Sequence, residues 1–221
     1  MTDTTVTQAL WQAVMGNNPS YFKGEQRLVD SVSWEDAQAF LQKLSQAYPQ
    51  LALRLPTEAE WECACRAGTN TAFAFGSKAE LNLGRVNYSG EWNNHNLKGA
   101  TQPVKTYPPN TWGLYEMHGN VWEWCEDWYA SDYGAEPQTD PRGAGSGEQR
   151  VVRGGSWFSG GRYCRSADRD RHAPDNWYSY LGFRFALGHL SSGIGQEQAG
   201  SLSGQARHGV APARAGGQTA G

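Results

Sequence analysis

The sequence lacks a long apolar run and a strong excess of charge of either sign. No stretch of about 18 apolar residues is present, so we expect no segment that crosses a membrane. The formal net charge is only −3, which gives no electrostatic reason to expect binding to nucleic acid or to an anionic membrane. The first residues, MTDTTVTQALWQAV, contain no basic segment followed by an apolar one, so no signal peptide is visible. We therefore expect a cytoplasmic protein, with export or surface display by another route left open.

Cysteine is also scarce. The four cysteines are Cys63, Cys65, Cys125 and Cys164, and their spacing does not match a paired CxxC zinc site. Cys63 and Cys65 are two residues apart on an expected helix, where their side chains would point to different faces and could not easily form a disulfide. We expect buried, reduced thiols.

Large rings and glycine are abundant instead. The chain of 221 residues fits one domain of ordinary size and contains ten Trp, ten Tyr and 27 Gly. This combination is typical of many turns around a core of aromatic rings, and it argues against a helical bundle.

Three helices are predicted, all in the first third of the chain. The first covers about residues 7–15 and ends at Gly16. The second follows Ser33, a candidate N-cap, and covers about residues 34–46. The third covers about 58–67, because Thr57 and Glu60 form a capping-box pattern.

After Gly68, short apolar pieces alternate with Gly, Asn, Pro and Asp, which predicts a loop-rich α+β fold with short strands. We expect the core of the domain to include Trp61, Trp122, Trp124, Phe183 and Leu114, with Trp128 beside them.

Residues 150–187 alternate between two kinds of residue. One kind forms a framework of Gly, Arg and apolar residues: 153–157, 164–167, Arg169, 174–175 and 181–184. The residues between them share no size, charge or polarity: Phe158, Ser159, Gly160, Tyr163, Asp168, Asp170, His172, Ala173, Asn176, Trp177, Tyr178, Ser179 and Tyr180. This pattern predicts a ligand-binding surface, within about residues 153–184, whose side chains can change without disturbing their support. We expect the framework residues to turn inward and one exposed patch to carry the rings of Phe158, Tyr163, Trp177, Tyr178 and Tyr180. An ordinary domain with a divergent loop is the alternative.

The chain changes character again near its C-terminus. Residues 190–221 contain eight Gly and no aromatic residue, so they bury too little apolar area to offset the entropy lost on ordering. We expect a domain at 1–189 followed by a disordered tail at 190–221, with a docked extension as the alternative.

The motifs of the chain, taken in order, resemble one family. They include VTQALW at 6–11, RLPTEAEWE at 54–62, GLYEM at 113–117, GNVWEW at 119–124, RGGSW at 153–157 and GFR at 182–184. The series resembles the formylglycine-generating-enzyme, or sulfatase-modifying-factor, domain from about residue 4 to 187. This resemblance implies a C-type lectin-like fold with little regular structure.

The resemblance alone does not fix the function. In the oxidases of the family, two cysteines after the RGGS block hold copper, which needs paired soft sulfur ligands. Only Cys164 is present in that segment here. We therefore expect neither copper nor formylglycine chemistry, although a copper-dependent oxidase-like enzyme stays open as an alternative. A non-catalytic accessory domain of a signalling or secretion system is another.

The chain is most similar to another group in the family, the variable proteins of diversity-generating retroelements. In these elements, adenines of AAC codons are randomised, which yields codons ending in C for Phe, Ser, Gly, Tyr, Asp, His, Ala and Asn. The residues between the framework positions belong to this set, and Trp177 alone needs another starting codon. Tyr, Trp, Ser, Gly and Asn are also the residues of antibody binding surfaces. The resemblance therefore implies a non-catalytic protein that binds a protein or other macromolecular ligand.

The resemblance also implies a calcium site at Glu116, Gly119, Val121 and Glu123. Two carboxylates with two backbone carbonyls suit a hard cation. The alternative is that Glu123 pairs with an arginine inside the core. We interpret Arg153, Arg169 and Arg184 as structural residues that tie loops together, and His118 as a packed or exposed loop residue.

Overall fold

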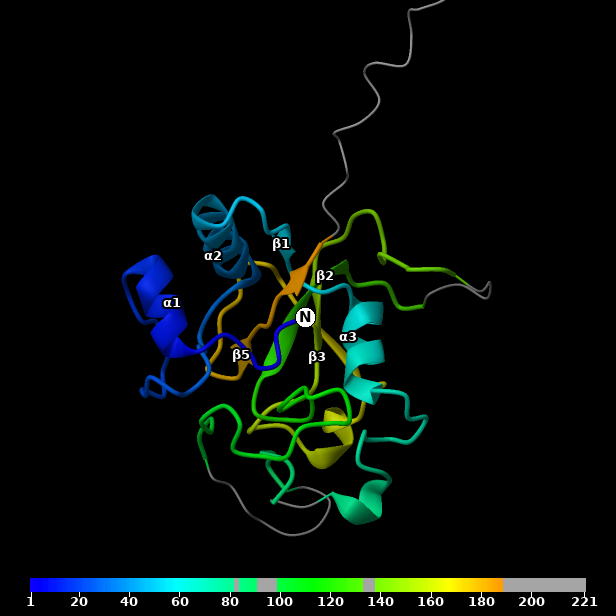
Figure 1. Ribbon diagram of the computed structural model, residues 1–221. Helices are drawn as coiled ribbons and strands as arrows, with labels where there is room; N and C mark the ends of the chain where they lie inside the picture. The colour runs from blue at the N-terminus through cyan, green and yellow to red at the C-terminus, as the bar shows by residue number, and fades with distance from the viewer. Residues whose placement is uncertain (82–83, 91–98, 133–137, 189–221) are drawn as a thin grey trace, which may run out of the picture. The chain divides into compact units, whose positions relative to one another are not determined.

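Figure 1 shows a computed structural model of the protein, which describes residues 1–81, 84–90, 99–132 and 138–188. These residues fall in one unit, Met1–His189. The predicted tail at 190–221 lies outside the described residues. Within the described part, no helix is long and apolar enough to cross a membrane.

The three predicted helices are confirmed, and local capping explains their limits. They are α1 (Gln8–Met15), α2 (Trp34–Ala47) and α3 (Glu58–Arg66). The Thr7 side chain caps α1, which ends at Gly16 in the left-handed conformation. Ser33 and Asp36 form a capping box at the start of α2, and Thr57 and Glu60 form one at the start of α3. Two short 3-10 helices, η1 (Lys78–Glu80) and η2 (Gly161–Cys164), lie in the loops.

Two small sheets complete the fold. The larger has the order β4-β3-β2-β5, formed by β4 (Arg169–His172), β3 (Arg150–Arg153), β2 (Trp122–Trp128) and β5 (Leu181–Gly182). Its pairs are antiparallel except that β2 runs parallel to β5. The smaller sheet pairs β1 (Leu53–Arg54) with β6 (Ala186–Leu187), antiparallel.

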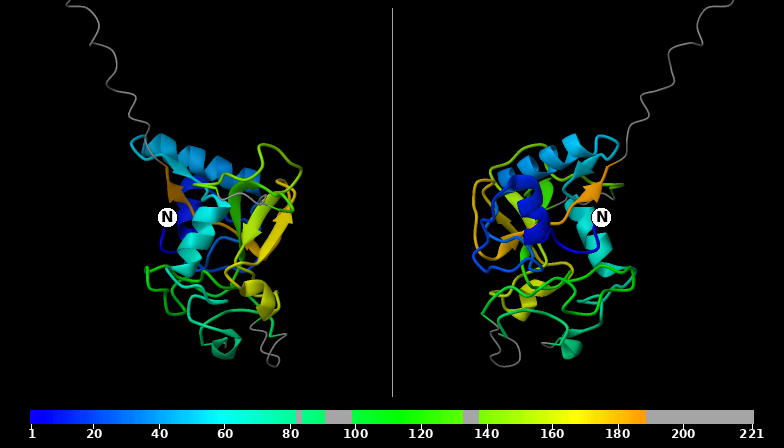
Figure 2. Two further views of the ribbon diagram at one scale, coloured as in Figure 1. Left: turned by 90° about the vertical axis from the view of Figure 1, so that its right-hand side faces the viewer. Right: turned by 60° about the vertical axis from the view of Figure 1, so that its left-hand side comes forward.

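The larger sheet separates two layers of helix. Helices α1 and α2 lie on one side of it and α3 on the other (Figures 1 and 2). Side chains alternate accordingly along the strands. Trp124 and Val152 join the core under α1 and α2, whereas Cys125 and Val151 pack with Trp61 of α3.

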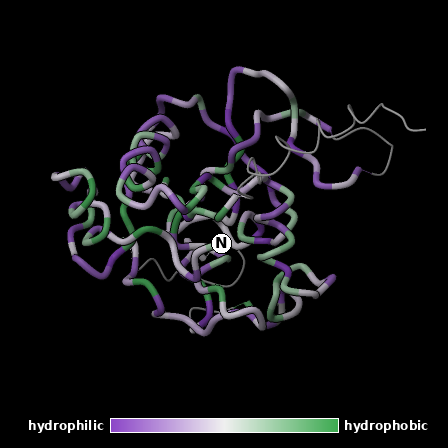
Figure 3. The backbone as a smooth tube through the Cα atoms, turned by 45° about the horizontal axis from the view of Figure 1, so that its top comes forward, coloured by the Kyte–Doolittle hydropathy of each residue, from purple (hydrophilic) through white to green (hydrophobic). Residues whose placement is uncertain are grey.

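Fewer than half of the described residues lie in helices or strands. Outside them, the hydropathy of the chain changes every few residues (Figure 3). The α+β, loop-rich prediction is confirmed.

Buried rings form much of the core, as predicted. Trp61, Trp124 and Phe183 are fully buried and Trp122 is 4% exposed. Leu114 is less buried than these rings: it packs against the cluster around Trp61 but also borders two surface cavities. Trp128 is also half-buried and stacks on the Arg150 guanidinium, 3.4 Å from the ring centroid.

Three arginines tie the loops to this core, which confirms their predicted structural role. Arg153 is fully buried, pairs with Glu62 of α3 and donates to the carbonyls of Asp168 and Ser166. Arg169 makes a two-pronged contact with the carboxylate of Glu58. Arg184 binds Glu123 and the carbonyls of Thr2, Asp3 and Tyr115.

Candidate ligand-binding face

Five of the predicted binding residues meet on one surface, which we call the ring face: Phe158, Asp170, His172, Tyr178 and Tyr180. Tyr178 and Tyr180 stack at 5.0 Å between ring centroids, and Phe158 lies parallel to Tyr180 at 6.4 Å. The His172 ring contacts both tyrosines, at 5.4 and 6.0 Å. These residues come from three separate segments: the turn after residue 156, strand β4, and the residues that precede β5.

Hydrogen bonds and strand pairing place the three segments. The turn that carries Phe158 is held by Ser156, whose Oγ accepts from the Phe158 amide at 3.3 Å. The tyrosines precede β5, and the Tyr180 carbonyl accepts from the amide of Trp122 on β2 at 2.8 Å. Asp170 and His172 lie on the edge strand β4 and point to the same side.

Residues 173–180 cross from one edge of the sheet to the other, because β4 and β5 are the two edge strands. The start of α2 holds this crossing segment: the amides of Trp34 and Glu35 donate to the Pro174 carbonyl at 3.1 and 3.3 Å. Trp124 of β2 lies beneath it, with its ring 6.2 Å from that of His172. The ring face is therefore supported by a helix terminus and a buried strand.

Exposure differs among the predicted rings. Phe158 is 64% exposed, Trp177 65%, Tyr178 42% and Tyr163 36%. The prediction that Tyr180 is strongly exposed was wrong, because this ring packs partly against the core under α1 and α2. Burial raises the pKa of Tyr180 and lowers the pKa of His172.

The other predicted residues are dispersed. Ala173, Asn176, Trp177 and Ser179 lie in the crossing segment, and the Ser179 carbonyl accepts from the Trp157 indole at 3.0 Å. Ser159 and the buried Gly160 follow Phe158. Tyr163 belongs to η2 under the guanidinium of Arg162, and Asp168 pairs with Arg165 at 2.9 Å. The side-chain contacts of Tyr163 and Asp168 link neither of them to the ring face among the described residues.

The framework is mostly inward, as expected. Residues 153–156 and 181–184 are all buried. Arg165, Ala167 and Asp175 are exposed, however, so the expectation was wrong for them. They occupy turns, and Arg165 uses its charge on Asp168 at the surface.

Two aromatic residues next to the ring face were not predicted from the sequence. Phe22 contacts the framework ring of Trp157 edge-on at 5.3 Å, and Tyr21 contacts Phe22 at 4.9 Å. Tyr21 is 73% exposed. No sequence signal separates this pair from core aromatics, because they lie more than a hundred residues before Trp157.

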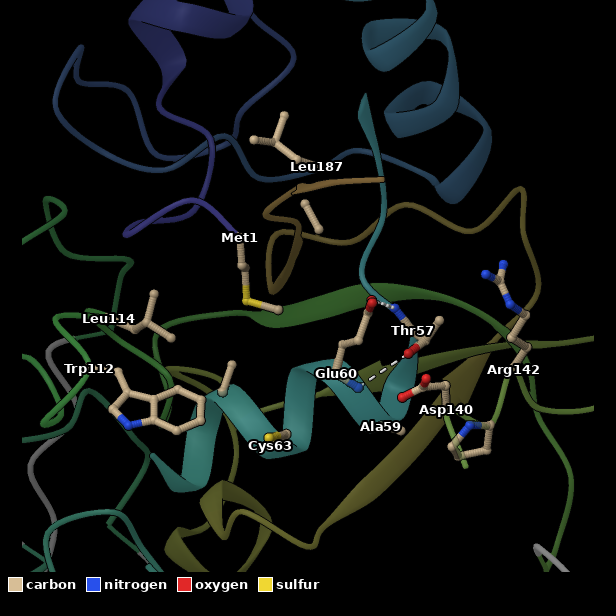
Figure 4. Close-up of a pocket in the computed structure, with 13 residues that line it drawn as sticks. Met1, Thr57, Ala59, Glu60, Cys63, Trp112, Leu114, Asp140, Arg142 and Leu187 are labelled. Atoms are coloured by element: carbon tan, nitrogen blue, oxygen red, sulfur yellow. Dashed lines mark hydrogen bonds between the residues drawn. The ribbon is translucent and has the colours of Figure 1, made fainter. Parts of the chain in front are cut away.

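A cavity of about 610 Å³ lies elsewhere, between α3 and strand β6 (Figure 4). Trp112, Leu114, Met1 and the exposed thiol of Cys63 line it. Glu60 also borders it, but its carboxylate is already bound to Arg54 and to the Thr57 amide. No sequence pattern predicted this cavity.

Comparison with known proteins decides the family. The chain matches the sulfatase-modifying factor enzyme 1-like domain over residues 1–188. The chain belongs to this family. It is similar to Treponema denticola variable protein 1, with 36% identity and a TM-score of 0.76 over 84% of this chain and 82% of that one. The fold is therefore the lectin-like fold of this family, as predicted.

Sequence relatives in the family differ in kind. The formylglycine-generating enzyme of Mus musculus is 38% identical over 197 residues, which are 84% of this chain and 50% of the enzyme. The serine/threonine-protein kinase pkn1 of Chlamydia pneumoniae is 37% identical over 161 residues, 72% of this chain and 23% of the kinase. The chain thus spans about half the length of the mouse enzyme and a smaller part of the kinase.

Two buried cysteines, Cys164 and Cys65, contact the imidazole of His118. Cys164 is fully buried, and its carbonyl accepts from His118 Nδ1 at 2.7 Å. Cys65 Sγ lies 3.7 Å from Nε2 of the same imidazole. The sequence did not predict this contact, because the two residues are 53 positions apart. Burial raises the pKa of Cys65 to about 12 and also raises the pKa of Cys164. Both thiols are therefore protonated at neutral pH and are weak nucleophiles.

The predicted calcium site fits its residues only in part. Glu116 is 6% exposed, and its Oε2 has no hydrogen-bond partner among the described residues, so this oxygen could bind a cation. Glu123, in contrast, binds Arg184 through both oxygens and the Trp61 indole through one. The pairing of Glu123 with a core arginine is thus confirmed. Gly119 and Val121, which lie between the two glutamates in the sequence, are both buried. The calcium site stays a prediction.

Proposed function

We propose that this chain is a non-catalytic binding protein, and that the ring face is the centre of a surface diversified by a retroelement. The observation that carries the proposal is the convergence of Phe158, His172, Tyr178 and Tyr180 from three segments onto a rigid, buried support. Exposed rings in one patch are typical of a site that binds a partner. Similarity to a variable protein supports this choice within the family.

The partner of such a surface is a protein or another macromolecule. Stacked tyrosines give a large contact area with few rotatable bonds, so little conformational entropy is lost on binding. The framework beneath them includes residues 153–156 and 181–184, which are buried and would stay constant while the outward side chains vary.

The genomic test of diversification is direct. We expect a near-copy of the segment that encodes residues 150–187 to lie beside a reverse-transcriptase gene. The copy should carry AAC at the positions of Phe158, Tyr178 and Tyr180. A neighbourhood without such a copy would contradict the retroelement part of the proposal.

The absence of catalysis has its own test. The purified chain should leave a sulfatase-type cysteine peptide unmodified in the presence of copper(I), with the product assayed for aldehyde by mass spectrometry. The mouse formylglycine-generating enzyme serves as the positive control. Conversion of the peptide would establish the oxidase alternative and overturn this part of the proposal.

A second candidate function is an accessory domain of a signalling protein. The similarity to part of a chlamydial protein kinase favours it. In that case the gene would lie within or beside a signalling or secretion locus, and substitutions on the ring face would leave partner binding unchanged.

A further inference from the structure

One carboxylate stands among the rings of the ring face. On β4, Asp170 and His172 point to one side, and Arg169 and Arg171 point to the other. The two arginines lie over the ring of Tyr129, at 4.8 and 4.3 Å. Strand alternation therefore leaves Asp170 as the charged residue that β4 contributes to the ring face.

Asp170 has no cationic partner within the described residues. Its Oδ1 accepts from the Arg171 amide at 2.8 Å, and it takes part in no ion pair there. Its negative charge reaches the neighbouring rings, because it favours the protonated forms of both His172 and Tyr180 and so acts to raise the pKa of each. A half-exposed carboxylate of this kind attracts a positive group.

The rings themselves also lack a cation. Elsewhere the protein places guanidinium groups over its aromatic rings: Arg150 lies between Trp34 and Trp128, and Arg162 lies over Tyr163. In the part of the chain that the structure describes, no arginine or lysine lies over Phe158, Tyr178 or Tyr180. His172 does not supply the charge at neutral pH, since burial lowers its pKa.

We propose that the ring face binds an arginine side chain of a polypeptide partner, with the guanidinium between the tyrosine stack and the Asp170 carboxylate. The planar guanidinium can stack on Tyr178 or Phe158 and donate hydrogen bonds to a carboxylate at the same time, which a lysine ammonium does less well. This inference rests on the proposed function and names the chemistry of its ligand.

The test uses the full chain and a small probe, N-acetyl-arginine N-methylamide. An NMR titration should shift the amide signals of residues 158, 170–172 and 177–180. The matched probe, N-acetyl-citrulline N-methylamide, has the same shape but no charge and should cause no such shifts. Asp170→Asn should weaken arginine binding by about fivefold, as expected for an exposed cationic contact.

Asp140→Asn is the matched control variant. It removes one exposed carboxylate that lines the cavity between α3 and β6. The backbone of Asp140 is in the left-handed region (φ 47°), which Asn tolerates. We expect arginine binding by this variant to equal that of the unmodified chain. Equal shifts with citrulline, no shifts at the ring face, or no effect of Asp170→Asn would overturn the inference.

A selection from a random peptide library separates this failure from failure of the proposed function. If the selected peptides lack arginine but lose binding upon Tyr178→Ala, the ring face is a binding surface and the arginine inference is wrong. If no selected peptide depends on Tyr178 or Phe158, the proposed function fails with it. Arginine-bearing peptides that lose affinity with both Asp170→Asn and Tyr178→Ala would support both.

Discussion

Arg184 and Glu123 form a fully buried, two-pronged ion pair, with Nε to Oε2 at 2.7 Å and Nη2 to Oε1 at 2.9 Å. The pair joins the C-terminal GFR block to the central strand β2. Trp61 of α3 donates to the same carboxylate at 2.8 Å. One ion pair thus links three parts of the fold.

Arg184→Met should lower the free energy of unfolding by about 3–5 kcal/mol, because the Glu123 carboxylate would stay buried without its partner. Chemical denaturation measures this loss. The control is Lys105→Gln, which breaks the exposed ion pair with Asp3 and should cost less than about 1 kcal/mol. Similar losses for the two variants would contradict the structural role of Arg184.

Gly155→Ala should destabilise the domain more than Gly16→Ala. Both glycines are in the left-handed region, at φ 75° and 83°, so each substitution adds backbone strain of about 1 kcal/mol. An added Cβ at Gly155 would also lie 2.6 Å from Cys164 Sγ and 2.9 Å from the Tyr163 carbonyl, whereas nothing lies within 4 Å at Gly16. We expect a further loss of roughly 1–3 kcal/mol at Gly155, measured by urea unfolding. Equal losses of unfolding free energy at the two sites would mean that Tyr163 and Cys164 can shift to make room for the added Cβ at Gly155.

Tyr178→Ala should change the free energy of unfolding by no more than about 0.5 kcal/mol, because its ring is on the surface. Tyr180→Ala should cost roughly 1–2 kcal/mol more, since this ring packs against the core. Thermal unfolding of the two variants gives the comparison. A larger loss of unfolding free energy for Tyr178→Ala than for Tyr180→Ala would contradict the greater burial of Tyr180.

His118 should contribute stability at neutral pH that is lost on acidification. Burial lowers the pKa of His118 from 6.5 to about 4, so between these values the unfolded chain binds the proton and the folded chain does not. The contribution is present above pH 6.5 and is lost progressively as the pH falls to about 4, by about 3 kcal/mol in total. Urea unfolding from pH 7.5 to 4.5 measures it. His118→Gln should be less stable at neutral pH but should show a weaker pH dependence, and an unchanged dependence would rule out His118 as its source.

Native thiol chemistry should be confined to one cysteine. Cys63 is exposed, whereas Cys65, Cys125 and Cys164 are buried with raised pKa values. At pH 7.5 a thiol-reactive disulfide reagent should label one cysteine in the folded chain and four after unfolding, and Cys63→Ser should abolish the native reaction. Copper(I) titration of the folded chain should show no tight site. Rapid native labelling of Cys164 would contradict both expectations.

Much of the fold was determined by local sequence. Capping residues such as Ser33 and Thr57 fix the helix starts through bonds to amides three residues away, and Gly16 ends α1 through its backbone freedom. The ordered motifs likewise indicated the family, the framework of residues 153–184 and the structural arginines. These features depend on neighbours in sequence or on blocks that keep their order.

The position of each side chain on the ring face was decided only by the tertiary structure. Burial of Tyr180 depends on a core formed by α1 and α2, and exposure of Leu114 depends on two cavities bordered by distant segments. The contacts of Phe22 with Trp157 and of Cys65 with His118 join residues that are far apart in the sequence. Their spacing in the sequence does not predict these contacts. Alternation along β4 placed Asp170 with the rings and the two arginines away from them, because a strand assigns its side chains to faces only once its register in the sheet is set.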